Sequence, residues 1–290
     1  MGTAGRYTGS AFLETTLTRT AEQTTKEANQ KTEPNFESRT ESPLESLASI
    51  CTVLAIGAFV MTFIFQNFKI PSGSMEKTLL IGDHVLADRT SFSPPAIWAP
   101  FTHYRDIRHG DIIVFYKPNA EVPEMFLVKR AIGLPGDHIH LRNGIVFLNG
   151  VEQNEPQAGK PIADGKMQHA YQPYRDDFPA IPPGPEEEGR VTASWANDLP
   201  NHIQNGDLVV PPGKVFAMGD NRTESLDGRY WGFVPRENIV GRPMFVYWSF
   251  ETPAEQISKQ SVGERIGFMG HILVHIFDQT RWKRTLHVIR

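Results

Sequence analysis

The segment that decides the fold class is FLVKRAIGLPGDHIHLRNGIVFL, residues 126–148. It contains three short runs rich in strand-forming residues, 126–132, 138–142 and 145–148, with turn residues between them. Asn143-Gly144, between the last two runs, is a strong signal for a type I′ hairpin. The segment therefore predicts antiparallel strands that follow one another closely.

Strand-like runs continue on both sides of this segment. Residues 111–116 precede it, and residues 207–210, 214–218 and 239–248 follow it. The 24 glycines and 22 prolines of the chain suit strands and turns better than a helical bundle. Residues 152–206 hold eight prolines and no sustained period, which predicts a loop-rich insertion with room for one small hairpin. We expect a mainly β domain of antiparallel sheets over residues 69–250.

An uncharged apolar segment, residues 46–68, precedes the predicted β domain. As a helix, residues 47–65 would span roughly 30 Å, the thickness of the hydrocarbon core of a bilayer. A cleaved signal peptide would begin near residue 1, after a basic region, and would end at small residues. A buried helix of a soluble protein is the other alternative, although it is seldom apolar without interruption. We predict one transmembrane anchor. The numbers of Lys and Arg residues on its two sides are similar, so they leave its orientation open.

The two ends of the chain differ from this body. Residues 1–45 contain ten threonines and many charges, which predicts a disordered tail. Residues 251–290 place apolar residues at helical spacing and then Arg281, Lys283, Arg284 and Arg290, which predicts an amphipathic helix with a basic end. Whether this extension contacts lipid stays open.

Composition excludes several classes of function. The formal net charge of −4 disfavours a nucleic-acid-binding protein. The single cysteine, Cys51, rules out an intramolecular disulfide and a cysteine-based metal cage. The pairs His138/His140 and His271/His275 lack the glutamate of a zincin motif, and we expect neither a metal nor a cofactor.

A candidate nucleophile and a candidate base lie in separate segments. Residues 68–79 read FKIPSGSMEKTL, a turn in which a serine hydroxyl and backbone N–H groups can face a substrate, although Ser-Gly-Ser also occurs in ordinary turns. No Gly-x-Ser-x-Gly elbow accompanies any serine. Lys129 lies in an apolar strand, where burial would lower its pKa and make it a base, unless it is an edge lysine that reaches solvent.

The third polar motif is MGDNRTESLDGRYWGFVP, residues 218–235. Its closely spaced opposite charges, followed by Tyr230-Trp231, indicate a buried loop. We expect its Asp and Arg residues to pair and one of its hydroxyls to reach another part of the site.

These three motifs, in this order behind an anchor, resemble those of the bacterial type I signal peptidases. The resemblance covers residues from about Leu47 to Ser249. Members of this family are membrane-bound Ser/Lys endopeptidases that remove signal peptides from exported proteins. The resemblance implies that Ser74 is the nucleophile and Lys129 the general base. It implies an oxyanion hole made by the Ser72 hydroxyl and the Ser74 backbone N–H, and a lysine amine that Ser225 orients.

The resemblance also assigns supporting residues and a substrate cleft. Asp227 and Arg229 would form a structural ion pair, with Arg130 and Asp220 as further partners. The residues implied to line a shallow cleft are Phe68, Ile70, Pro71, Met75, Leu79 and Val128. One departure is Lys77, where many relatives have proline.

The partners implied by the resemblance are signal-peptide-bearing preproteins and a lipid bilayer. The implied location is the cytoplasmic membrane, with the tail in the cytoplasm and the β domain outside; the oligomeric state stays open. One rival function is a self-cleaving Ser/Lys regulator, which would need a soluble DNA-binding domain where this chain has a tail and an anchor. Another is a non-catalytic tethered domain that binds exported peptides by strand addition, which would need neither Ser74 nor Lys129.

Overall fold

The computed structural model describes residues 42–93, 104–118, 125–164, 166, 169–253, 256 and 261–289. The predicted tail lies almost entirely outside these residues. The chain separates into two compact units, Met1–Ala55 and Ile56–Arg290, and every strand that the described residues form lies in the second.

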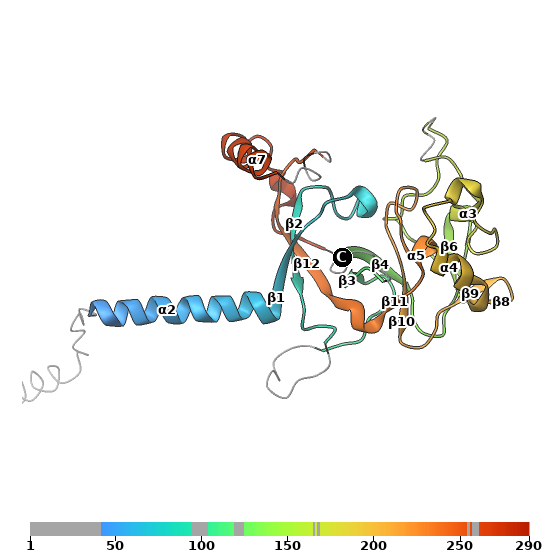
Figure 1. The fold of residues 1–290 in the computed structure, drawn as a ribbon, viewed down its shortest axis with the longest axis horizontal. Helices are drawn as coiled ribbons and strands as arrows, with labels where there is room; N and C mark the ends of the chain where they lie inside the picture. The colour runs from blue at the N-terminus through green and yellow to red at the C-terminus, as the bar shows by residue number, and fades with distance from the viewer. Residues whose placement is uncertain are drawn as a thin grey trace, which may run out of the picture. The chain divides into compact units, whose positions relative to one another are not determined.

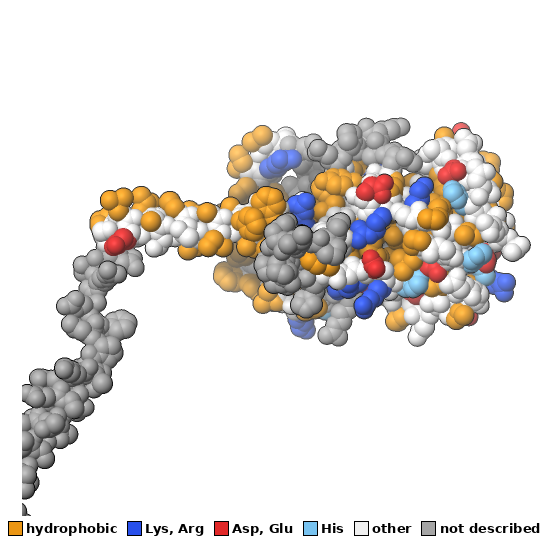
Figure 2. All heavy atoms as spheres, turned by 90° about the horizontal axis from the view of Figure 1, so that it is seen from below, with side chains coloured by type: hydrophobic (Ala, Val, Ile, Leu, Met, Phe, Trp, Pro, Cys, Tyr) orange, Lys and Arg blue, Asp and Glu red, His pale blue; other side chains and the backbone are white. Residues whose placement is uncertain are grey.

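The apolar segment forms helix α2, Pro43–Phe59, which continues as a π-helical turn, Val60–Ile64 (Figure 1). These 22 residues have a mean hydropathy of 2.3 over their most apolar 18-residue window, and none of that window is buried. Hydrophobic side chains cover the helix in Figure 2. A helix of this length and composition is able to cross a bilayer.

The helix ends four residues before the predicted end of the anchor. Residues Phe65–Lys69 instead form strand β1, which pairs antiparallel with β2, Asp83–Asp88. The backbone N–H of Arg89, just after β2, donates to the carbonyl of Ile64 at 3.0 Å. The chain therefore passes from the apolar helix directly into the sheet.

The larger sheet has eight antiparallel strands in the order β1-β2-β12-β3-β4-β10-β11, with β13 paired to β12. The bounds of its remaining strands are β3 Ile112–Tyr116, β4 Phe126–Gly133, β10 Lys214–Met218, β11 Val234–Pro235, β12 Ile239–Ser249 and β13 His287–Val288. Strand β12 is the longest and pairs with β2, β3 and β13, with register shifts along its length. Such irregularities bend a strand, so the sheet curls around it.

The second sheet has five antiparallel strands in the order β7-β6-β5-β9-β8. Its strands are β5 His138–Arg142, β6 Ile145–Leu148, β7 Val151–Glu152, β8 Ile203–Gln204 and β9 Asp207–Val209. Asn143 and Gly144 have φ values of 50° and 76° between paired strands, which confirms the predicted type I′ hairpin. The mainly β, antiparallel fold class is likewise confirmed.

A single large apolar cluster fills the space between the two sheets. Ile113 and Phe115 of the larger sheet share it with Ile139 and Leu208 of the smaller sheet, and all four are fully buried. A smaller cluster lies at the other end of the larger sheet, beneath the turn that carries Ser74. Its buried members are Ile70, Met75, Leu79, Val85, Ile112, Val246 and Ile289.

The described residues between β7 and β8 form four short helices that the sequence did not predict. They are α3 Pro173–Asp176, a 3-10 turn at Pro185–Glu187, α4 Ala193–Asp198 and a 3-10 turn at Leu199–His202. Tyr174 and Trp195 on these helices are buried in the large cluster. The insertion is therefore packed onto the β body rather than suspended above it.

The C-terminal extension forms α7, Val262–His275, which begins with a capping box between Ser261 and Glu264. The helix ends before the basic residues, which lie in a 3-10 turn, Trp282–Arg284, and its flanks. Arg284 pairs with the buried carboxylate of Asp83 at 2.5 Å, and Arg281 donates to the carbonyl of Ile81 at 3.0 Å. Two of the basic residues thus hold the extension against the body.

Candidate active site

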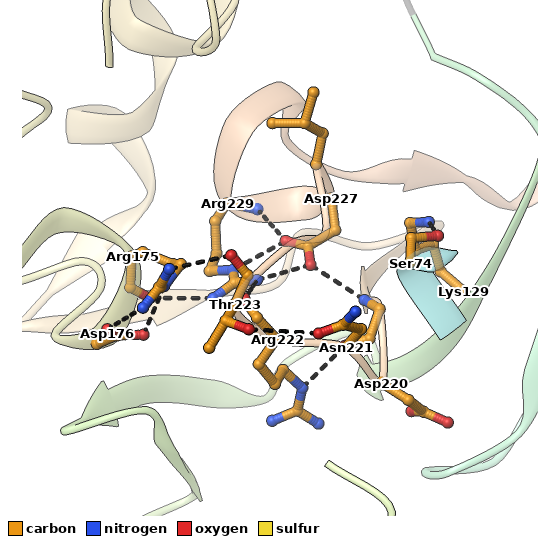
Figure 3. Close-up of polar contacts among 12 residues, drawn as sticks. Ser74, Lys129, Arg175, Asp176, Asp220, Asn221, Arg222, Thr223, Asp227 and Arg229 are labelled. Carbon is orange, nitrogen blue, oxygen red and sulfur yellow. Dashed lines mark hydrogen bonds and ion pairs between the residues drawn. The ribbon is translucent and has the colours of Figure 1, made fainter. Parts of the chain in front are cut away.

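The structure brings Ser74 and Lys129 together. Ser74 lies on a 3-10 turn, Gly73–Met75, that follows β1, and Lys129 lies in β4 (Figure 3). The Nζ atom of Lys129 donates to Oγ of Ser74 at 2.6 Å. The lysine is only 3% exposed, whereas Ser74 is half-buried. A hydroxyl that faces the surface thus has a sheltered amine as its hydrogen-bond partner.

Burial changes the acidity of this amine. Loss of hydration lowers the pKa of Lys129 from 10.5 to about 8, and Asp227 and Asp220 oppose that shift only partly. The Arg229 guanidinium lowers the pKa further. At mildly alkaline pH a large fraction of the amine is therefore neutral and can accept a proton.

The loop after β10 holds the turn that carries Ser74. The backbone N–H of Asn221 donates to the Ser74 carbonyl, and the Asn221 amide donates to the Gly73 carbonyl, both at 3.1 Å. On the other side of the turn, Met75 and Leu79 are buried in the smaller cluster. The turn is therefore fixed from both sides, which limits movement of the hydroxyl.

Gly219 allows this close approach. A Cβ on Gly219 would lie 2.2 Å from Ser225 Oγ and 2.4 Å from the Ser74 carbonyl oxygen. Its backbone N–H donates to the Asp227 carboxylate at 3.0 Å. No side chain fits at this position without displacing the segments that carry Ser74 and Ser225.

Asp227 and Arg229 form the predicted ion pair, with 2.8 Å between Arg229 Nη2 and Asp227 Oδ2 (Figure 3). Both side chains are fully buried. Burial alone would raise the pKa of Asp227, but Arg229 and the Gly219 N–H hold that pKa below its usual value. Arg229 also donates to the carbonyl oxygens of Arg175 and Arg222. The pair thus organises the loop by hydrogen bonds in several directions.

Arg130 and Asp220 form a second buried pair at 2.6 Å. Arg130 also donates to the Gly110 carbonyl, and Thr78 donates to the Asp220 carboxylate. This pair joins β4, the loop after β10 and the segment that follows Ser74.

The sequence did not identify the support that the insertion gives to this loop. Arg222, fully buried, pairs with Glu155 at 2.5 Å. The carbonyl of Arg229 accepts hydrogen bonds from the Tyr174 hydroxyl and from the Trp195 indole. These contacts join residues 34 to 67 positions apart, and no local pattern at Glu155, Tyr174 or Trp195 signals them.

The two other serines of the predicted site lie beside the Ser74–Lys129 pair. The Ser72 hydroxyl is exposed and lies 3.4 Å from the Ser74 hydroxyl. Ser225 is buried against Gly219, and within the described ranges its hydroxyl has no hydrogen-bond partner. A buried hydroxyl without a partner is costly, so this one is available to a group that moves within reach.

The six residues expected to line a cleft differ in their exposure. Ile70, Met75 and Leu79 are buried. Phe68 and Val128 are half-buried and pack against that same cluster, whereas Pro71 is exposed. The accessible apolar surface next to Ser74 is therefore provided mainly by Phe68, Pro71 and Val128, with the other three beneath it.

Neither histidine pair belongs to a cluster that could hold a metal among the residues that the structure describes. His140 hydrogen-bonds to Asp207 at 2.7 Å, and His138 lies 3.8 Å from that carboxylate. The rings of His271 and His275 lie 4.5 Å apart, and His275 contacts Asp278. Both pairs thus have neighbours that account for their positions.

Comparisons with known proteins place the chain in a family. The family model described as signal peptidase, peptidase S26, matches residues 44–248. Signal peptidase I of Buchnera aphidicola subsp. Acyrthosiphon pisum (strain APS) is 33% identical over 264 residues, which cover 79% of this chain and 82% of that protein. Signal peptidase I of Pseudomonas fluorescens is 34% identical over 218 residues, with coverages of 71% and 72%.

A crystal structure of a signal peptidase I from Enterococcus faecalis V583 aligns with 48% of this chain and 97% of its own, at 26% identity and a TM-score of 0.28. Signal peptidase I of Bacillus caldolyticus is 32% identical over 208 residues, which cover 72% of this chain and 91% of that protein. The family model and the curated relatives, matched over more than two thirds of the chain, decide the family. The chain belongs to the signal peptidase family, peptidase S26.

Proposed function

We propose that this protein is a membrane-anchored serine endopeptidase that removes N-terminal signal peptides from exported preproteins, with Ser74 as nucleophile and Lys129 as general base. The observation that carries the proposal is the 2.6 Å hydrogen bond between a buried lysine amine and a serine hydroxyl. A purely binding domain has no need for this pair. Membership of this family supports signal-peptide-bearing preproteins as the substrates, because the matched proteins are signal peptidases.

The reaction follows from the positions of the two groups. Neutral Lys129 accepts the Ser74 hydroxyl proton while Oγ bonds to the scissile carbonyl carbon. The protonated amine then gives that proton to the leaving nitrogen as the peptide bond breaks, which leaves an acyl ester on Ser74. Neutral again, Lys129 takes a proton from water, and the hydroxide hydrolyses the ester. The proton goes from lysine to the released serine oxygen, which restores the starting state.

Ser72 and Ser225 have different roles in this proposal. The exposed Ser72 hydroxyl, beside Ser74, donates to the oxyanion together with the Ser74 backbone N–H. One such donor contributes about 3–4 kcal/mol to transition-state stabilisation. The unpartnered Ser225 hydroxyl accepts from the lysine amine when that amine turns away from Ser74 to protonate the leaving group. Both roles act on the rate rather than on the choice of substrate.

Substrate choice depends on the apolar surface next to Ser74. Side chains one and three residues before the scissile bond point to the same side of an extended peptide. We expect the surface of Phe68, Pro71 and Val128, with a buried layer below it, to offer only shallow pockets that accept small side chains. We therefore expect alanine at both positions, as in the Ala-x-Ala pattern of secretory signals.

The anchor keeps this site near a membrane. Ser74 lies ten residues beyond Ile64, the last residue of the apolar helix. The arrangement that suits exported substrates has the tail in the cytoplasm and the β body on the outer face of the cytoplasmic membrane. Protease added to spheroplasts should then digest the β body and spare the tail. Digestion of the tail alone would show the opposite topology and contradict the proposal.

The test of the proposed function is cleavage of a preprotein by the full chain in detergent. Mass spectrometry of the products should show one cut, directly after the second alanine of Ala-x-Ala. Ser74→Ala should abolish the cut and leave thermal unfolding unchanged. Cleavage by Ser74→Ala at the wild-type rate, or cuts spread along the preprotein, would overturn the proposal.

A further inference from the structure

Helix α7 presents its apolar face to solvent. Val262, Ile266, Met269, Leu273 and Phe277 follow one another at intervals of three or four residues and are 64–81% exposed. This spacing places the first four, which belong to α7, on one side of the helix axis, and Phe277 follows in the turn after the helix. No residue of α7 is buried. A contiguous apolar face of this kind marks an interaction surface.

The opposite side of α7 is fixed to the β body mainly by contacts with aromatic rings. Phe268 packs against Phe250 at 6.2 Å between ring centroids, and the Lys69 ammonium lies 5.3 Å from the centre of the Phe268 ring. His271 also contacts Phe250 and hydrogen-bonds to Gln279 at 2.9 Å. A surface helix of a soluble protein buries its apolar side, whereas α7 also has a second apolar side that stays exposed.

The β body links α7, with its exposed apolar face, to the end of the apolar helix at Ile64. Residues 56–64 belong to the same compact unit as the β body and α7. Arg89 fixes this helix end, because its backbone N–H donates to the Ile64 carbonyl and its guanidinium to the Thr62 carbonyl, both at 3.0 Å. Strand β1 covers the five residues from Phe65 to Lys69, roughly 17 Å at 3.3 Å each, and Lys69 contacts α7.

The residues around the exposed face match the chemistry of a bilayer surface. Trp282 is 55% exposed and stacks on Phe277 with 6.4 Å between ring centroids. Exposed aromatic rings of this kind favour the headgroup region. Arg265 in α7 and Lys283 next to Trp282 are also exposed and can contact anionic headgroups. An apolar helix face flanked by aromatic and basic residues is typical of an interfacial helix.

We propose that α7 is an interfacial helix that lies in the headgroup region of an anionic bilayer, with its apolar face against the acyl chains. It gives the β body a second attachment to the membrane that the first anchor crosses. This inference rests on the membrane anchoring in the proposed function. Two attachments, one at each side of β1, hold the candidate site at a fixed orientation to the membrane surface.

The test uses the full chain in vesicles of phosphatidylcholine and phosphatidylglycerol. Cys51, the only cysteine, is replaced by Cys51→Ala, and a bimane fluorophore is attached at Leu273→Cys or, as the matched control, at Val151→Cys. Val151 is an equally apolar residue, 63% exposed on β7 of the smaller sheet. Lipids with a doxyl group near the headgroup should quench the fluorophore at position 273 at least two-fold and leave position 151 within about a tenth.

Two other quenching results would contradict the interfacial helix. Equal, weak quenching at both positions would mean that α7 does not contact lipid. A blue-shifted emission at position 273 without quenching would mean that a protein, such as a second copy of this chain, covers the face. Cleavage of a preprotein by the same vesicles is measured in parallel. Vesicles that cleave without quenching refute only the interfacial helix, and vesicles that quench without cleaving refute only the proposed function.

A second variant controls for an indirect effect of the label. With the fluorophore at Phe277→Cys, the double change Ile266→Gln and Leu273→Gln should reduce quenching at least three-fold. Both side chains are more than 60% exposed, so cleavage of a short peptide in detergent should stay within two-fold of wild type. Unchanged quenching in this variant would overturn the assignment of the apolar face as the lipid contact.

Discussion

The Nζ atom of Lys129 lies 2.6 Å from the Ser74 hydroxyl, in a position where burial lowers the pKa of the amine to about 8 despite two nearby carboxylates. The same burial that suits this lysine to accept a proton also costs stability. Activity and stability should therefore respond in opposite directions when the amine is removed.

Lys129→Met should be inactive and more stable than wild type at pH 7. The pKa of the amine is about 8 in the folded protein and 10.5 when unfolded. Protonation thus favours the unfolded state, by about 3 kcal/mol below pH 8. Methionine has a similar length and removes this cost. Unfolding in detergent at pH 7 measures the difference.

The pH dependence of that difference provides the control. As the pH rises from 8 to 10.5, the unfolded state of wild type loses its excess proton, and wild type gains stability. The advantage of Lys129→Met should therefore fade over this range. If Lys129→Met were less stable than wild type at pH 7, desolvation would not dominate the environment of the amine.

Gly219→Ala should reduce kcat/KM by about 100-fold, because the new Cβ would displace Ser225 or the Ser74 carbonyl by an ångström or so. Gly267→Ala is the matched control, since a Cβ there has no neighbour within 4 Å. Peptide cleavage in detergent measures both variants. A fully active Gly219→Ala would mean that the close packing of these segments is not required for catalysis.

The buried pair of Asp227 and Arg229 should show strong coupling. Arg229→Met alone leaves the Asp227 carboxylate buried without its partner, at a cost of about 3–5 kcal/mol in the free energy of unfolding. Asp227→Asn combined with Arg229→Met should cost less than Arg229→Met alone, because the amide is neutral. Equal losses in the single and double variants would show that the hydrogen bonds of Arg229 to the loop, and not its charge, set its contribution.

Lys77 has a φ of 81°, a conformation that glycine adopts easily and that proline cannot adopt. Lys77→Gly should be neutral or stabilising by up to about 1 kcal/mol. Lys77→Pro should destabilise by more than about 1 kcal/mol and lower activity, because the turn of Ser74 is three residues away. A more stable Lys77→Pro would contradict this turn conformation.

Local patterns in the sequence were sufficient for β3, β4, β10 and β12 of the larger sheet and for β5, β6 and β9 of the smaller sheet. Strand β4 and the hairpin at Asn143-Gly144 lie where the sequence predicts them, since strand-forming runs and turn residues act over short distances. Composition predicted that Asp and Arg residues of the buried loop would pair, and the family resemblance identified Asp227 and Arg229 as the pair.

The features that the sequence did not predict depend on contacts between residues that are far apart in the chain. Strand β2 alternates buried and half-buried residues but begins and ends with aspartates, and its pairing with β1 and β12 makes it a strand. The last residues of the predicted anchor likewise belong to strand β1, because they pair with β2. The amphipathic pattern of α7 predicts a helix but not which face contacts the body, since that depends on contacts with distant residues such as Phe250 and Lys69.

The pH dependence of kcat/KM, with a signal-peptide substrate, tests the central claim that a neutral Lys129 activates Ser74. The account predicts that kcat/KM rises with pH to a plateau, with a single apparent pKa near 8, and that Lys129→Arg is inactive at every pH because arginine does not deprotonate. An apparent pKa near 6.5, as for a histidine base, together with an active Lys129→Arg variant, would contradict it.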